Sequence, residues 1–157
     1  PEWANLRFFS DNPPTAEFPD GPRVSGARFQ ATGPSSCPTH FTIGRTRMWG
    51  IGLFPLGWAR FIGTSASDHS NTIVDGEQSP IFERFAPLCE KLCTRDYSDE
   101  EQFDFLTDFF RQLAGPPREQ PVAVAGALLL LPRKPSPQVR PEVEGGIHAW
   151  RNRIHTM

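Results

Sequence analysis

The stretch RMWGIGLFPLGWARFIG, residues 47–63, decides which fold this sequence can adopt. It holds ten apolar side chains and four glycines around a single proline, Pro55. At a period of two, its first part places Trp49, Ile51 and Leu53 on one face of a strand. From Pro55 the apolar spacing becomes helical, and proline is tolerated in the first turn of a helix. We therefore expect a buried strand that runs directly into a short helix.

The other face of this strand carries two bare glycines, Gly50 and Gly52. They predict either a close approach by another backbone or a bulge that bends the sheet. A membrane-spanning segment is excluded, because the run between Arg47 and Arg60 is far shorter than the roughly 18–20 apolar residues that a bilayer requires.

Alternating apolar residues predict further strands in the first half of the chain. These strands cover residues 4–10, 23–33 and 40–44, and turn-forming residues such as DNPP and Gly33-Pro34 end the first two. With 45–54 they make about four antiparallel strands at short spacing, which is typical of a barrel or a sandwich.

The second half of the chain is expected to be helical. Helices are predicted at about 55–62, 79–93 and 98–114. Ser79 is a suitable N-cap for the second helix, and Ser98 with Glu101 forms a capping box for the third. The predicted fold class is α+β: an antiparallel, β-barrel-like or cupin-like sheet in the first half, followed by helices and a disordered C-terminal tail.

The charge distribution divides the chain into two parts. Its 157 residues suit one compact domain and a tail, and the net charge is −2. Residues 1–115 hold 10 Lys and Arg against 15 Asp and Glu, hence −5, while residues 116–157 hold 6 against 3, hence +3. The acidic body is a poor candidate for nucleic-acid binding. We expect 132–157 to be mostly disordered and 122–131 to form a short helix or strand.

The cysteines and histidines do not form a metal-binding pattern. Three cysteines, an odd number, indicate reduced thiols in a cytoplasmic protein. Cys89 and Cys93 stand one helical turn apart, but two ligands do not make a structural zinc site, so we interpret them as core residues. The four histidines form no HxH or HExxH motif. We therefore expect no metal and no cofactor.

Catalytic signatures are also missing from the sequence. The acidic residues 99–101 suit the first turn of a capped helix better than an acid–base pair. No serine lies in a GxSxG motif, and GIGLFPLG lacks the residues that complete a phosphate loop. The expected protein is not an enzyme.

One group of residues has the composition of a ligand site. Arg45, Arg47, Trp49 and Trp58 surround the junction of the long strand and the short helix. Arginine and tryptophan near the mouth of a barrel suit an apolar or anionic small molecule. The simpler interpretation, buried tryptophans beside solvent-facing arginines, is favoured.

Several ordered segments resemble a known family. They are PEWANLRFFS, GARFQATGPSS, FTIGRTRMWGIGLFPLGWARFIG and VDGEQSPIFERFAPL, followed by the acidic helix. Together they are similar to the N-terminal domain of a branch of bacterial AraC-type transcriptional regulators, over residues 1–115. The matching positions are Gly33 and Pro34 after the second strand, Gly52, Phe54, Pro55 and Gly57 at the strand-to-helix turn, and Trp58.

The resemblance implies a domain that senses a small effector or forms a homodimer, in a cytoplasmic regulator without membrane contact. DNA would be read by a C-terminal helix-turn-helix domain. Residues 116–157 do not continue the family pattern, which suggests a shifted reading frame or a truncated product, and the start at Pro1 suggests a fragment or a processed chain.

Two alternatives stay open beside this interpretation. One is a small cupin-like, metal-dependent enzyme, which is supported only by the predicted barrel and His40. The other is an interaction module that pairs two copies of the chain through an apolar helix face containing Phe105 and Phe109.

Overall fold

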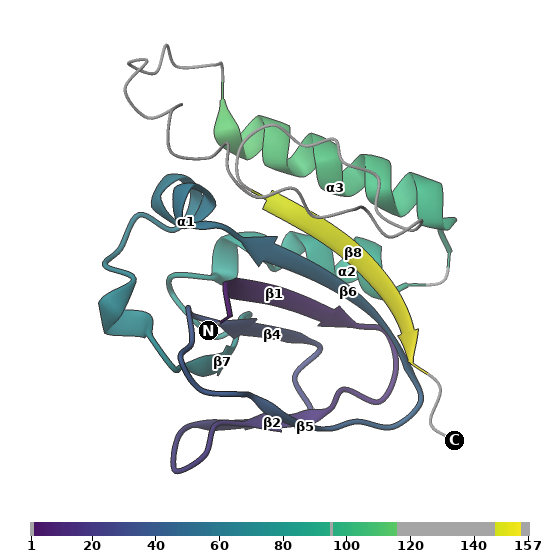
Figure 1. Cartoon of the computed structure of the whole chain (residues 1–157). Helices are drawn as coiled ribbons and strands as arrows, with labels where there is room; N and C mark the ends of the chain where they lie inside the picture. Colours follow the sequence, from purple (N-terminus) through teal and green to yellow (C-terminus); the bar gives the residue numbers. More distant parts are fainter. Residues whose placement is uncertain (1, 95, 116–146, 155–157) are drawn as a thin grey trace, which may run out of the picture.

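Two antiparallel sheets and three α-helices form the part of the chain that the computed structural model describes, residues 2–94, 96–115 and 147–154 (Figure 1). The predicted α+β class is confirmed. Both sheets are open, with strand orders β7-β4-β1-β6-β8 and β3-β2-β5, so the described strands form no closed barrel.

The large sheet contains the strand predicted in the decisive stretch. Its strands are β1 (Ala4–Phe9), β4 (Phe29–Thr32), β6 (Thr46–Leu53), β7 (Ile73–Asp75) and β8 (Ile147–Ile154), and the small sheet consists of β2 (Thr15–Glu17), β3 (Arg23–Ser25) and β5 (His40–Thr42). The antiparallel register of β1 and β6 runs without interruption from Ala4 opposite Leu53 to Phe9 opposite Met48. No bulge therefore occurs at the two glycines of β6 along this pairing, so of the two alternatives predicted for these glycines the bulge was wrong.

The tail contributes one described strand. Residues 147–154, inside the stretch for which the sequence indicated disorder, form β8, which pairs with β6 along its whole length. Backbone hydrogen bonds to an open sheet edge require no particular side-chain pattern, so side-chain periodicity did not indicate this strand. The short helix or strand expected at 122–131 lies outside the described residues.

The stretch predicted as one strand over 23–33 is two strands in different sheets. Gly26 has a positive φ of 73°, a conformation that glycine adopts at little cost. The chain turns there, so that β3 belongs to the small sheet and β4, which starts at Phe29, belongs to the large one. The apolar residues change phase at this turn, because Val24 stands at an even position and Ala27, Phe29 and Ala31 stand at odd ones, so the change of phase was the available sequence signal.

One face of the large sheet packs against the helices and forms the main core (Figure 1). The sheet supplies the three side chains predicted to share a face of one strand, Trp49, Ile51 and Leu53, together with Leu6, Phe8, Phe29 and Ala31. The helical side supplies Trp58, Phe61, Phe85, Leu88, Leu92, Leu106 and Phe110. A second, smaller cluster contains Ala16, Phe18 and Ile73. The periodicity of the strands thus predicted the main core correctly.

The three α-helices are α1 (Pro55–Phe61), α2 (Pro87–Cys93) and α3 (Asp99–Ala114). The predicted helix over 79–93 is shorter: α2 begins at Pro87, after a 3₁₀ turn over Glu83–Phe85. Proline at position 87 lacks an N–H and therefore favours a new helix start over the middle of a longer helix. In the described ranges, no helix combines the length and the apolar character that crossing a bilayer requires.

Helix α3 begins as the sequence predicted. The Ser98 hydroxyl accepts a hydrogen bond from the backbone N–H of Glu101, and the Glu101 carboxylate accepts from the backbone N–H of Ser98 at 2.7 Å. The hydrogen bonds from Ser98 hold the pKa of Glu101 below its usual range. The capping box thereby fixes the direction in which α3 leaves the preceding loop.

Gly33, after β4, is a position where only hydrogen fits. A Cβ atom there would lie 1.7 Å from the carbonyl oxygen of His69. We expect Gly33→Ala to lower the free energy of unfolding by about 1–3 kcal/mol, because backbone must move to make room. Gly44→Ala is the matched control, because a Cβ at Gly44 meets nothing within 4 Å. Urea unfolding of both variants measures the difference, and equal stabilities would contradict this role of Gly33.

Candidate functional site

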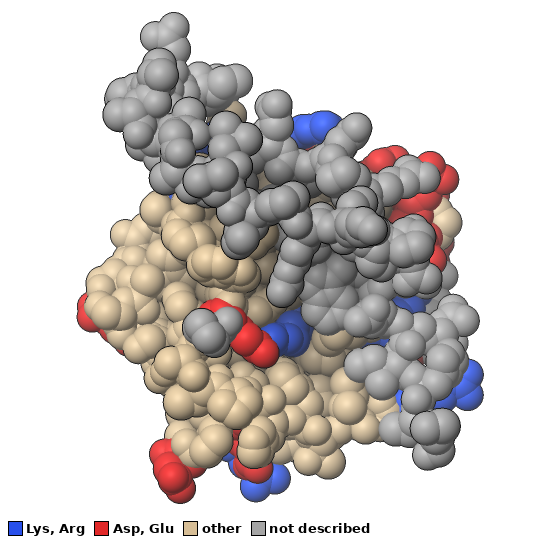
Figure 2. Space-filling model, viewed as in Figure 1, with Lys and Arg blue, Asp and Glu red and all other residues tan. Residues whose placement is uncertain are grey.

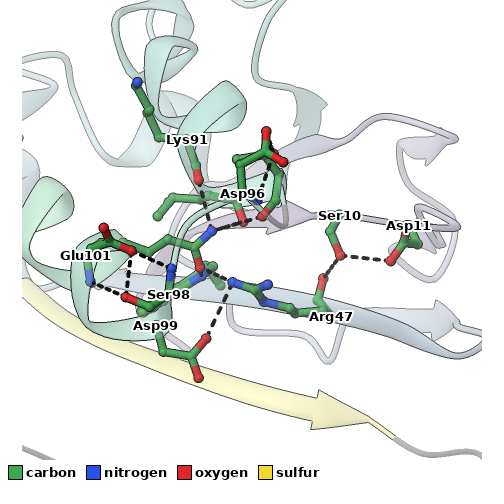
Figure 3. Close-up of polar contacts among 12 residues, drawn as sticks. Ser10, Asp11, Arg47, Lys91, Asp96, Ser98, Asp99 and Glu101 are labelled. Atoms are coloured by element: carbon green, nitrogen blue, oxygen red, sulfur yellow. Dashed lines mark hydrogen bonds and ion pairs between the residues drawn. The ribbon is translucent and has the colours of Figure 1, made fainter.

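Two of the four residues predicted for a ligand site lie together on β6. Arg47 and Trp49 are two residues apart in the strand, so their side chains lie on the same face of the sheet. The Trp49 side chain is buried, while 17% of the Arg47 side chain is exposed. Figure 3 shows Arg47 reaching from β6 toward Asp99 at the start of α3. The strand thus brings a nearly buried cation and a buried indole to the first turn of a helix.

Both side chains bind the same partner, the buried amide of Gln102. The Trp49 indole N–H donates to the Gln102 Oε1 atom at 3.0 Å, and the Arg47 guanidinium donates to the same oxygen. Gln102 is only 1% exposed. A buried acceptor with two lone pairs is fully satisfied by two donors, so this oxygen is well matched to its site.

The amide nitrogen of Gln102 binds the C-terminal end of α2. It donates to the carbonyl oxygens of Lys91 at 2.9 Å and Thr94 at 3.0 Å, with that of Leu92 farther away at 3.4 Å. The last carbonyls of a helix have no partner within the helix, so this amide replaces the missing donors. One side chain therefore links β6, α2 and α3.

Asp99 adds a partly exposed ion pair to this network. Its Oδ1 atom lies 3.5 Å from the Arg47 Nη2 atom, and 58% of its side chain is exposed. An ion pair this open to water contributes little to stability by itself. The ion pair matters more for its position, because it lies where the Arg47 guanidinium reaches the solvent-exposed edge of the network.

The other two predicted residues lie elsewhere. Arg45 precedes β6 and is exposed, and its carbonyl oxygen accepts a hydrogen bond from Asn12. Trp58 lies on α1, where its indole N–H donates to the Thr64 carbonyl oxygen and its ring packs beside His69. The structure therefore brings together Arg47 and Trp49 and does not bring Arg45 or Trp58 to the same contacts.

The residues predicted at turns have structural contacts. The backbone N–H of Gly33 donates to Thr72, and the carbonyl of Pro34 accepts from Asn71. Gly52 lies opposite Asn5 in the sheet, and Gly57 is buried in α1. Phe54 precedes α1 as its N-cap residue, with Pro55 in the first turn, as the sequence indicated.

Arg7 is a buried arginine that was not among the predicted site residues. Burial lowers its pKa to about 10, and the nearby Glu2 carboxylate partly opposes that shift. Its guanidinium donates to the Thr32 hydroxyl and lies 5.1 Å from the centre of the Phe41 ring. An arginine in the middle of an alternating strand looks solvent-facing in the sequence, and only the small sheet that packs against it reveals the burial.

The network at Gln102 holds the Arg47 guanidinium and the Trp49 indole in place, and Asp99 neutralises the charge of Arg47. Among the residues that the structure describes, no three His, Cys, Asp or Glu side chains gather where they could hold a metal ion, and His40 is exposed on β5. Comparisons of the chain with protein-family models, with curated proteins and with solved structures found no match.

Truncation of Gln102 tests the importance of the network. We expect Gln102→Ala to lower the free energy of unfolding by about 3 kcal/mol, because the Trp49 N–H and the carbonyls of α2 lose a buried partner. The control is Gln112→Ala, which removes the same side chain from an exposed position of α3. Urea unfolding compares the variants, and a loss no larger than that of the control would contradict the role given to Gln102.

Proposed function

We propose that residues 1–115 form the regulatory domain of an AraC-type transcriptional regulator, which responds to a small effector. The resemblance of ordered segments along these residues suggests the family. The structural observation that carries the proposal is the contact of Arg47 and Trp49 with one buried amide. A ligand that binds the Arg47 guanidinium changes the hydrogen bonding of Gln102. It thereby changes the link between β6, α2 and α3.

The chemistry of the site favours an anionic effector. Arg47 is held by the neutral Gln102 amide and by Asp99, whose side chain is 58% exposed. The carboxylate of a ligand can replace the Asp99 carboxylate at the guanidinium with the same charge and geometry. An effector of this class exchanges one ion pair for another and does not have to desolvate a free buried charge.

Regulation of DNA binding would be indirect in this proposal. The described surface visible in Figure 2 is mostly uncharged, and its basic side chains are scattered and do not form a continuous patch on that face. Phosphate contacts supply most nucleic-acid affinity, so this face is poorly suited to holding DNA. The DNA-reading unit is therefore assigned to a separate domain.

Homodimerisation through the phenylalanines of α3 receives little support. Phe105 and Phe109 are half-buried and pack against the main core, and the Phe109 ring centre lies 6.2 Å from that of Phe85. They therefore do not form the exposed apolar face that such an interaction module needs. Effector sensing is the better supported of the two roles.

Thermal unfolding of the full chain with a panel of small carboxylates and aromatic acids tests the proposal. A ligand present at 100 times its Kd stabilises the native state by about 2.7 kcal/mol, which raises the Tm by several degrees. We expect at least one acid to do so, and we expect Arg47→Gln to abolish the shift.

Arg45→Gln is the matched control, because it removes the same charge from an exposed position two residues away. It should keep the ligand-dependent shift. The proposal is contradicted if no acid raises the Tm, or if both variants retain the shift equally.

A further inference from the structure

The two cysteines of α2 form a close pair that no part of the proposed function uses. The Sγ atoms of Cys89 and Cys93 lie 3.5 Å apart, and both residues are buried free thiols. Cys93 is the last residue of α2 and Thr94 after it is extended, so the pair occupies the end of the helix. The third cysteine, Cys37, is exposed.

The positive charge of Arg28 acts on this pair. Its guanidinium interacts electrostatically with both sulfurs, and the Arg28 side chain is exposed to solvent. A nearby cation stabilises a thiolate, which is the reactive form of cysteine. The carboxylates of Asp75 and Glu77 also act on Cys89 and oppose this effect.

The two thiols differ in their tendency to ionise. The hydrogen bond shared with Cys93 lowers the pKa of Cys89 despite its burial, and Arg28 adds to this effect. The same hydrogen bond, together with burial, raises the pKa of Cys93. The hydrogen bond between the two sulfurs, which lie 3.5 Å apart, favours a state in which one thiol is ionised and its neighbour keeps the proton, and we assign the thiolate to Cys89.

We propose that Cys89 and Cys93 are an oxidation site, at which a hydroperoxide converts the two thiols into a reversible disulfide. The Cys89 thiolate attacks one peroxide oxygen, an S–O bond forms as the O–O bond breaks, and the departing oxygen leaves as water or alcohol after taking up a proton. The Cys93 sulfur then attacks the Cys89 sulfur, forming the S–S bond, and the hydroxyl of the sulfenic acid leaves as water with the Cys93 proton. The two thiols lose two electrons and the peroxide gains them.

The disulfide requires a local change at the end of α2. Residues one turn apart in a helix have Cβ atoms about 5–6 Å apart, whereas a disulfide needs about 3.5–4.5 Å. The last turn must tighten, and Gln102 binds the carbonyl of Lys91 in that turn and the carbonyl of Thr94 directly after it. Oxidation therefore shifts the carbonyl groups that bind the Gln102 amide, which also accepts the hydrogen bond of the Trp49 indole. A strained disulfide of this kind is also readily reduced.

The experiment uses the full chain with Cys37→Ser, which leaves Cys89, Cys93 and Arg28 in place and removes the exposed thiol. After treatment with hydrogen peroxide, trypsin cuts between the two cysteines at Lys91. We expect mass spectrometry to find the peptides 85–91 and 92–95 joined by a disulfide, and dithiothreitol to separate them. Free thiols at both positions, under conditions that oxidise Cys37 in the unchanged chain, would overturn the proposal, as would conversion to sulfinic acid without the link.

Two further measurements test the assigned roles. Arg28→Gln should slow disulfide formation about tenfold, as expected for a tenfold smaller thiolate fraction. Arg23→Gln is the control. It removes a charge on β3 that pairs with Glu17 on β2, and it should leave the rate unchanged.

Tryptophan fluorescence should change as the disulfide forms and should not change in Trp49→Phe. An equal rate in both arginine variants would refute the role of Arg28, and constant fluorescence would refute the coupling to Gln102.

Discussion

The buried amide of Gln102 is the constraint on which the arrangement of strand and helices depends. Its oxygen accepts from Arg47 and Trp49 on β6, and its nitrogen donates to the carbonyls at the end of α2. Apolar packing in the main core is not directional and tolerates small shifts between helix and sheet. An amide buried at 1% exposure must meet its partners at fixed distances, so it sets the position of α3 on the sheet.

The sequence predicted the elements with strong local signals. The alternation in 4–10 and 45–54 identified β1, β6 and their buried faces, and the capping box identified the start of α3. It could not predict which sheet each strand joins. The turn at Gly26 moves β3 away from β4, and a local pattern holds no information about a partner strand distant in the sequence.

For the candidate site, the sequence identified Arg47 and Trp49 but not the residue that joins them. Gln102 lies at i, i+4 and i+8 with Leu106 and Phe110, so it shares the helix face that is buried in the core. A polar residue on such an apolar stripe is the available sequence signal for a buried amide. Arg45 and Trp58 are close to the other two residues in sequence only. The contacts of Arg45 are set by the loop after β5, and those of Trp58 by α1.

A double-mutant cycle between Trp49 and Gln102 tests the central claim most directly. It combines Trp49→Phe, which removes the indole N–H and keeps an aromatic ring in the core, with Gln102→Ala, and the free energy of unfolding is measured for all four chains. The account predicts a coupling energy of about 1 kcal/mol or more between the two positions. If the effects add to within about 0.3 kcal/mol, the amide does not link β6 to the helices, and the account is wrong.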